Sequence, residues 1–175
     1  MTENIVMKKY NVKKIALTGI FTGLAVVGSL ISIPVLGAKC APVQHVINII
    51  SAIILGPWYA LSSAFLASLI RNILGIGTLL AFPGSMCGAL LAGLLFEYSK
   101  KFVGAYIGEL IGTSIIGGML SYPIATMLMG NSTAALFTFV IPFLISSAGG
   151  TIIAVMIIVS LNKAGMIGSI RRQLM

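Results

Sequence analysis

Long apolar stretches run along almost the whole chain and are separated by short segments that contain proline, glycine or charged residues. A helix needs about 20 residues to cross the roughly 30 Å hydrocarbon core of a bilayer. The pattern therefore predicts an all-α integral membrane protein with six transmembrane helices. The predicted helices cover residues 14–33, 42–55, 57–74, 83–98, 102–129 with a break near Pro123, and 134–161.

Two of these predicted helices are short. At 1.5 Å per residue, the helices over 42–55 and 83–98 span only about 21 Å and 24 Å. Both begin on the outer side, so the loops before them leave backbone at membrane depth. Such backbone is tolerated only where protein or a water-filled cavity surrounds it. The pattern thus indicates a cavity on the outer side, roofed by the loops 34–42 and 75–83. Tilted helices or misplaced boundaries are the alternative interpretation.

The composition supports the membrane assignment. Of 175 residues, 58% are hydrophobic and 8% are charged, with a mean hydropathy of +1.11, which excludes a soluble domain of this size. We expect one transmembrane domain over 1–175, including a short basic N-terminal segment, 1–13, and a C-terminal tail, 162–175. Sequence motifs for nucleotide, zinc-protease or serine-hydrolase chemistry do not occur, so no cofactor or metal is expected.

The net charge of +8 is interpreted as a topology signal and not as a sign of nucleic-acid binding. Most basic residues precede the first apolar run, lie between the fourth and fifth, or follow the last. By the positive-inside rule, both termini are expected in the cytoplasm. Lys39 and Arg71 fall on the opposite side. The residues assigned to the cytoplasmic side are Lys8, Lys9, Lys13, Lys14, Lys100, Lys101, Lys163, Arg171 and Arg172.

Polar residues form a stripe on the predicted second helix. Gln44, Asn48 and Ser51 recur at i, i+4 and i+7, and His45 lies beside them. Polar groups within a membrane are costly and therefore face the protein interior or a cavity. Such groups either join helices through hydrogen bonds or contact a ligand. Four of them in so short a stretch favour contact with a ligand.

Arg71 and Glu109 are the charged residues that most need an explanation. Arg71 violates the positive-inside pattern and either reaches outer headgroups or pairs with a carboxylate or ligand in the cavity. Glu109 lies seven residues into the fifth helix, and an isolated buried carboxylate is costly, which favours a functional role. We expect Glu109, His45 and Asn48 to form one polar site, whereas Glu97 is placed at the cytoplasmic interface.

Small residues are spaced along two predicted helices. Ala16, Gly19 and Gly23 share one face of the first helix, where another helix could approach closely. The predicted fifth helix repeats the pattern at Gly104, Gly108 and Gly112.

Three motifs carry a resemblance to a known family. They are KCAPVQHVIN at 39–48, LGPWYA at 55–60 and RNILGIGTLLAFPGS at 71–85, accompanied by Gly-Glu at 108–109 and Ser-Tyr-Pro at 121–123. Together they resemble the ThiW family over roughly residues 15–161. That family comprises substrate-binding S components of energy-coupling factor (ECF) vitamin transporters, and it is associated with the hydroxyethylthiazole moiety of thiamine.

The resemblance implies a six-helix S component of the bacterial cytoplasmic membrane, with a small-molecule ligand captured from outside. It also implies docking on a transmembrane coupling protein that carries two cytoplasmic ATPase subunits. Ala16, Gly19 and Gly23 would form the docking face, with glycine at two positions where alanine is usual in S components. The residues expected to bind substrate are Gln44, His45, Asn48, Arg71, Thr78, Glu109 and Tyr122.

Two alternatives remain open. Within the transporter class, the ligand could be thiamine itself or hydroxymethylpyrimidine. A lipid-modifying membrane enzyme is the alternative from another class, and it would have to recruit Glu97, Glu109, His45 and Arg71. Such enzymes need clustered acids for metal or acid–base chemistry, and three scattered carboxylates are too few. The protein is therefore not expected to be an enzyme.

Overall fold

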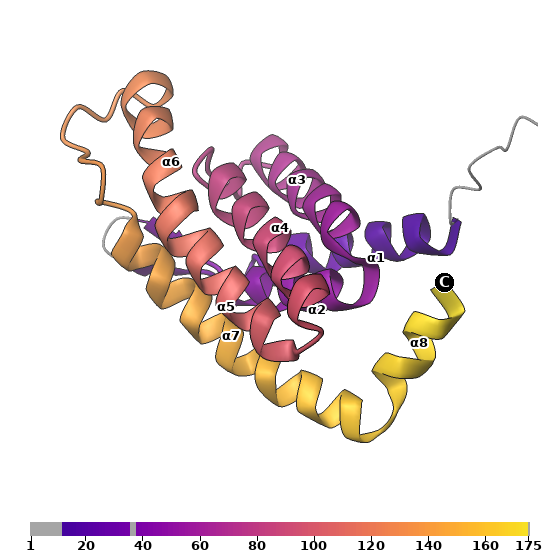
Figure 1. Cartoon of the computed structure of the whole chain (residues 1–175). Helices are drawn as coiled ribbons and strands as arrows, with labels where there is room; N and C mark the ends of the chain where they lie inside the picture. The colour runs from indigo at the N-terminus through magenta and orange to yellow at the C-terminus, as the bar shows by residue number, and fades with distance from the viewer. Residues whose placement is uncertain (1–11, 36–37, 175) are drawn as a thin grey trace, which may run out of the picture.

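The computed structural model describes residues 12–35 and 38–174, and most of them are helical (Figure 1). The expected all-α architecture is confirmed. The first elements are α1 (Val12–Gly28), the short strands β1 (Ile33–Val35) and β2 (Ala38–Cys40), α2 (Pro42–Leu55), α3 (Pro57–Ile73) and α4 (Ala81–Ser99). One long helical stretch follows, made of α5 (Phe102–Ile111), η1 (Gly112–Gly117), α6 (Gly118–Pro123) and η2 (Ile124–Leu128). The last helices are α7 (Val140–Lys163) and α8 (Met166–Leu174).

Helix α2 lies at the centre of the bundle. It begins at Pro42, whose missing N–H is no loss in the first helical turn, and it ends before Gly56, which has a positive φ of 90°. Pro57 then starts α3 at once. Helix α2 contacts α1, α3, α4, α5, α7 and α8, so that eleven of its 14 residues are buried. Its polar side chains are therefore enclosed by protein.

Helices α4 and α5 pack closely because glycines line their contact. A Cβ atom at Gly108 would lie 2.5 Å from the carbonyl oxygen of Leu91, and one at Gly112 would lie 2.5 Å from that of Cys87. Only glycine fits at such backbone distances. The π-helical turns η1 and η2 lie further along the same helical stretch, and η2 directly follows Pro123.

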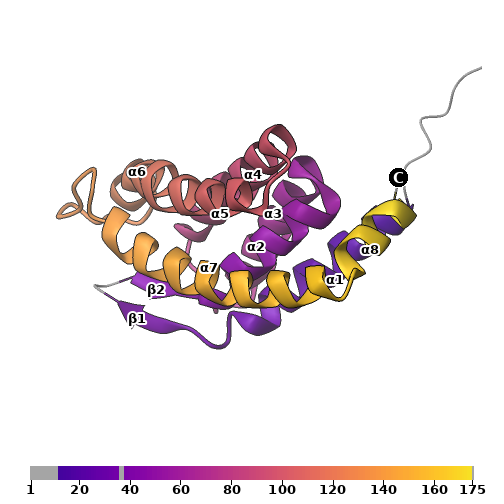
Figure 2. The same cartoon turned by 60° about the horizontal axis from the view of Figure 1, so that its bottom comes forward.

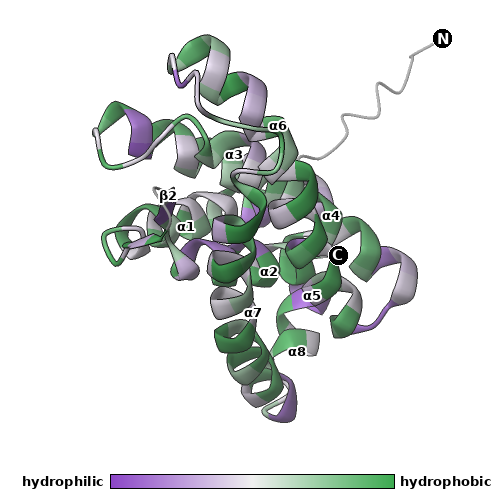
Figure 3. Ribbon diagram, turned by 90° about the vertical axis from the view of Figure 1, so that its left-hand side faces the viewer, coloured by the Kyte–Doolittle hydropathy of each residue, from purple (hydrophilic) through white to green (hydrophobic). Residues whose placement is uncertain are grey.

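Three helical stretches are long and apolar enough to cross a membrane: Ala81–Ser99, Phe102–Leu128 and Val140–Lys163. Helix α2 is a shorter apolar helix, and α1 and α3 have 17 residues each. Much of the helical ribbon has the colour of hydrophobic residues in Figure 3, and many large hydrophobic side chains are exposed. The structure thus supports a membrane protein, while six spans and cytoplasmic termini remain predictions.

Several predicted boundaries were wrong, and proline explains two of them. Helix α4 begins at Ala81 and α7 at Val140, whereas 83 and 134 were expected. Pro83 and Pro142 each occupy the first turn of their helix, where a missing N–H is tolerated. With 19 residues, α4 is about 28 Å long. Of the two helices expected to be short, only α2 is.

The ends of the chain also differ from expectation. Helix α1 ends at Gly28 instead of residue 33, and β1 then pairs with β2 in an antiparallel hairpin, with Ile33 opposite Cys40. The expected tail contains α8, which follows a turn at Gly165 with a φ of 70° and lies beside α1 (Figure 2). The Lys13 ammonium donates to the Gln173 carbonyl at 3.3 Å. Residues 1–11 of the predicted basic segment lie outside the described part of the chain.

Candidate ligand-binding site

Glu109 is the centre of a buried polar cluster. Its side chain is fully buried, and its Oε1 atom accepts hydrogen bonds from Asn48 Nδ2 at 3.1 Å and Thr113 Oγ1 at 3.0 Å. His45 Nδ1 lies 2.8 Å from the same oxygen. A carboxylate accepts, so the ring donates through Nδ1–H, and Nε2 of a neutral ring accepts from Ser146 Oγ at 3.0 Å. Donors from α2 and η1 thus converge on one carboxylate oxygen of α5.

Helix α4 leaves room for this carboxylate. A Cβ atom at Gly88 would lie 2.7 Å from Glu109 Oε2 and would also collide with Thr113 Oγ1. Asn48 ties the cluster to α4 as well, because its Nδ2 donates to the Ser85 carbonyl at 3.2 Å. The site therefore depends on the close approach of α4 and α5.

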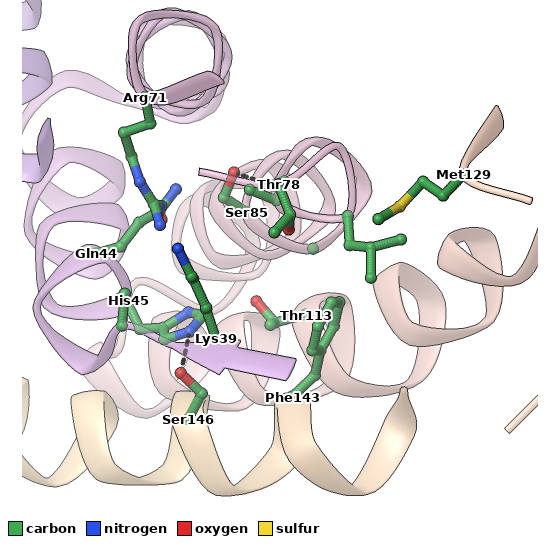
Figure 4. Close-up of a pocket in the computed structure, with 14 residues that line it drawn as sticks. Lys39, Gln44, His45, Arg71, Thr78, Ser85, Thr113, Met129, Phe143 and Ser146 are labelled. Carbon is green, nitrogen blue, oxygen red and sulfur yellow. Dashed lines mark hydrogen bonds between the residues drawn. The ribbon is translucent and has the colours of Figure 1, made fainter. Parts of the chain in front are cut away.

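A cavity of about 220 Å³ lies next to this cluster (Figure 4). Its lining comes from the hairpin, the segment between α3 and α4, and helices α2, α3, α4, η1 and α7. Apolar side chains of Leu80, Met129 and Phe143 form part of the wall. The polar lining residues are Lys39, Gln44, His45, Arg71, Thr78, Ser85, Thr113 and Ser146.

Both loops that were expected to roof a cavity contribute to its wall. Asn72 Nδ2 donates to the Thr78 carbonyl at 3.1 Å, which fixes the segment after α3. The Cys40 thiol donates to the Pro142 carbonyl at 3.3 Å, which holds β2 against α7. Burial raises the pKa of this thiol, so that it remains a donor. Lys39 is thereby placed at the cavity.

Arg71 and Gln44 pair with one another at the cavity wall. Arg71 is only 3% exposed, and its Nη1 atom donates to Gln44 Oε1. Arg71 Nε and Gln44 Nε2 are both buried and have no hydrogen-bond partner among the described residues. Among the described residues, the contact of a basic side chain with a carboxylate is that of His45 Nδ1 with Glu109 Oε1, and it does not include Arg71. A buried cation therefore lines the cavity, and two donors of this pair of side chains are enclosed without an acceptor among the described residues.

The structure brings most of the predicted substrate-binding residues together. Gln44, His45, Arg71 and Thr78 line the cavity. Asn48 and Glu109 lie behind this lining and reach the cavity through His45 and Thr113. Tyr122, the last of the predicted residues, lies on α6, is half-buried and does not line the cavity.

Four polar lining residues were not predicted. Thr113 lies four residues after Glu109, so helical spacing alone could have placed both on one face. Lys39 had been noted only as a charge on the outer side. Ser85 and Ser146 carry no signal in the sequence, because serine is common in membrane helices and only the packing of α4 and α7 brings them here.

The predicted docking residues lie on an open face of α1. Ala16, Gly19 and Gly23 are all exposed. A Cβ atom added at Gly19 or Gly23 would meet no atom within 4 Å. The opposite side of α1 is buried at Thr18 and Thr22, and Thr22 donates to Ser63 of α3 at 3.3 Å.

Apolar helices of membrane-spanning length around one small polar cavity define a membrane protein that binds a small solute. Residues 15–164 match the ThiW family, described as thiamine-precursor transporter protein, and the chain belongs to this family. The resemblance noted in the sequence is thereby confirmed. The family is one of transporters, in agreement with the expectation that the chain is not an enzyme. No curated protein and no solved structure matches the chain.

Proposed function

We propose that this protein is the substrate-binding S component of an ECF-type ABC importer and that it captures hydroxyethylthiazole from outside the cell. It would cross the bacterial cytoplasmic membrane six times with both termini inside. Its partners would be a transmembrane coupling protein and two cytoplasmic ATPase subunits. Thiamine and hydroxymethylpyrimidine remain the alternative ligands.

The cavity beside the Glu109 cluster is the observation that carries this proposal. Its volume of about 220 Å³ is below the roughly 300–1,000 Å³ of pockets for drug-sized ligands, which favours one ring over the two rings of thiamine. Phe143 and Leu80 offer an apolar surface for a ring, while His45, Thr113 and Ser146 offer hydrogen-bonding groups. A small heteroaromatic ring with a polar tail suits both parts of the wall.

The open face of α1 supports the role as a subunit. A face of glycine and alanine lets a partner helix approach to backbone distance, and within the described chain nothing occupies it at Gly19 or Gly23. Large apolar side chains flank this face, among them Ile20 and Leu24, which are about half exposed. Lipid or the coupling protein would cover them.

The proposal is tested by isothermal titration of the purified full-length protein with hydroxyethylthiazole, hydroxymethylpyrimidine and thiamine. We expect hydroxyethylthiazole to bind and thiamine to bind least well, because the cavity is small. Protein-free detergent micelles are the control for partitioning of the ligands. Failure of all three compounds to bind would overturn the assignment of a thiamine-related ligand. Tighter binding of hydroxymethylpyrimidine than of hydroxyethylthiazole would make the pyrimidine the proposed ligand.

A further inference from the structure

The wall of the cavity carries more positive than negative charge. Lys39 and Arg71 both line it, and no carboxylate is among its lining residues in the described chain. The nearby carboxylate of Glu109 lies behind the wall, where donors from His45, Asn48 and Thr113 already share its Oε1 atom. Neither Lys39 nor Arg71 pairs with Glu109, whose Oε1 atom lies 2.8 Å from His45 Nδ1 and whose Oε2 atom has no hydrogen-bond partner among the described residues.

The donors at one end of the cavity lack acceptors. Arg71 Nε and Gln44 Nε2 have no partner among the described residues, although the two side chains are only 3% and 4% exposed. A buried donor without an acceptor is costly, and a buried charge is more so. In Figure 4 the Arg71 and Gln44 side chains meet at this end, and the Lys39 ammonium points toward them. An acceptor that enters this end of the cavity would pair with these donors once the two side chains shift to reach it.

We propose that the precursor bound most tightly carries an oxyanion, either a carboxylate or a phosphate monoester, which lies between Arg71, Gln44 and Lys39. This inference rests on the proposed function, because it specifies the ligand of the same cavity. The planar guanidinium group matches both oxyanions, and hydrogen bonds between ionised partners are stronger than neutral ones. Phe143 and Met129 lie at the opposite side of the cavity in Figure 4, where the heteroaromatic ring would contact them.

The charge balance ranks the possible ligands. An alcohol tail, as in hydroxyethylthiazole, accepts a hydrogen bond but leaves both cations without a counter-charge. Thiamine carries a positive charge of its own and would be repelled by Lys39 and Arg71. An anionic tail gains attraction from both, and the low dielectric around the buried Arg71 strengthens its share more than that of the exposed Lys39.

The experiment compares three ligands with the same thiazole ring by isothermal titration. They are the neutral alcohol, its phosphate monoester, and the analogue whose tail ends in a carboxylate. We expect at least one anion to bind about tenfold or more tightly than the alcohol, as a charged hydrogen bond implies. The better of the two anions identifies the oxyanion. Inorganic phosphate and acetate serve as competitors that lack the ring.

Variants assign the preference to the two cations. Arg71→Gln and Lys39→Gln should each lower the affinity for the anion by a larger factor than the affinity for the neutral alcohol, so that the ratio of the two affinities falls. Lys101→Gln is the matched control, because that lysine is exposed and lies in the turn between α4 and α5. Lys39 is also exposed, so the Lys39→Gln variant should fold. It can therefore test the oxyanion site even if Arg71→Gln does not fold.

The outcomes separate this inference from the proposed function. Equal or tighter binding of the neutral alcohol overturns the oxyanion and leaves the thiazole assignment intact. An anion advantage that persists unchanged in the folded Lys39 and Arg71 variants overturns the oxyanion site at these residues. If no thiazole binds in any form, the proposed function fails, and the inference that rests on it fails too.

Discussion

Helices α1 and α5 carry glycines at similar spacing, yet the structure uses the two sets in opposite ways. On α5 and at the start of η1, the positions of Gly108 and Gly112 lie against the backbone of α4, with only 2.5 Å between a Cβ atom and the nearest carbonyl oxygen. On α1, nothing lies within 4 Å of a Cβ atom at Gly19 or Gly23. A pattern of small residues therefore shows where a helix can be approached closely, but not whether the partner belongs to the same chain.

The largest effect is expected when the glycines that pack against α4, Gly108 of α5 and Gly112 of η1, are replaced. In Gly112→Leu, a bulky side chain would have to enter the backbone contact with α4, which forces the two helices apart. Overpacking typically lowers the free energy of unfolding by about 1–3 kcal/mol. Because the added side chain would meet backbone atoms, we expect a loss at the upper end of this range or beyond it. We expect loss of the monodisperse peak in size-exclusion chromatography and a lower midpoint of thermal unfolding. Gly19→Leu is the matched control, and equal stability of the two variants would contradict the comparison.

A smaller and more selective effect is expected on α1. Gly19→Leu and Gly23→Leu should leave thermal stability and ligand affinity unchanged, because the added side chains enter open space. Co-purification with the proposed coupling protein and uptake into cells should be lost, since a leucine keeps a partner helix away. Loss of ligand binding together with docking would instead assign this face to the fold of the subunit.

The helix boundaries show what could be predicted from the sequence. Helix α2 was predicted with its observed boundaries, Pro42–Leu55, because Pro42 and the Gly56-Pro57 pair punctuate both ends. The start of α7 was placed too early, because apolar residues continue through the turn segment that precedes Val140. Helix α8 was missed, since it is only nine residues long and mixes charged with apolar residues, of which Ile167 and Leu174 are buried.

The candidate site was predictable in part for a similar reason. The polar stripe with Gln44 and Asn48 follows the period of one helix, so the sequence alone placed these side chains on one face. The structure brings His45, Asn48 and Glu109 together as expected. The pairing of Arg71 with Gln44 depends on how α3 lies against α2, and no local pattern encodes that packing. What one helix determines was predictable, and what two helices determine together was not.

The smallest of these effects is expected at Glu109, whose position depends on the tight α4–α5 contact. In Glu109→Gln the side chain keeps its size but loses its charge, so the bonds from His45, Asn48 and Thr113 become weaker. Hydrogen bonds to a charged group contribute more than neutral ones. We expect the variant to lose about 1–3 kcal/mol of binding free energy, which corresponds to a tenfold to more than hundredfold weaker affinity. Because Glu109 lies behind the lining, it acts by positioning His45 and Thr113.

Isothermal titration of folded, monodisperse protein measures this effect on the ligand that the native protein binds. Asn48→Ala should weaken binding in the same direction, because it removes one donor to the Glu109 carboxylate and one to the Ser85 carbonyl. Glu97→Gln is the control, since that carboxylate is exposed near the end of α4 and is not among the residues that line the cavity. If all three variants bind as tightly as the native protein, the Glu109 cluster only joins α2 to α5. The close packing of α5 would then serve the fold alone, and ligand recognition would rest on Arg71 and the segment around Thr78.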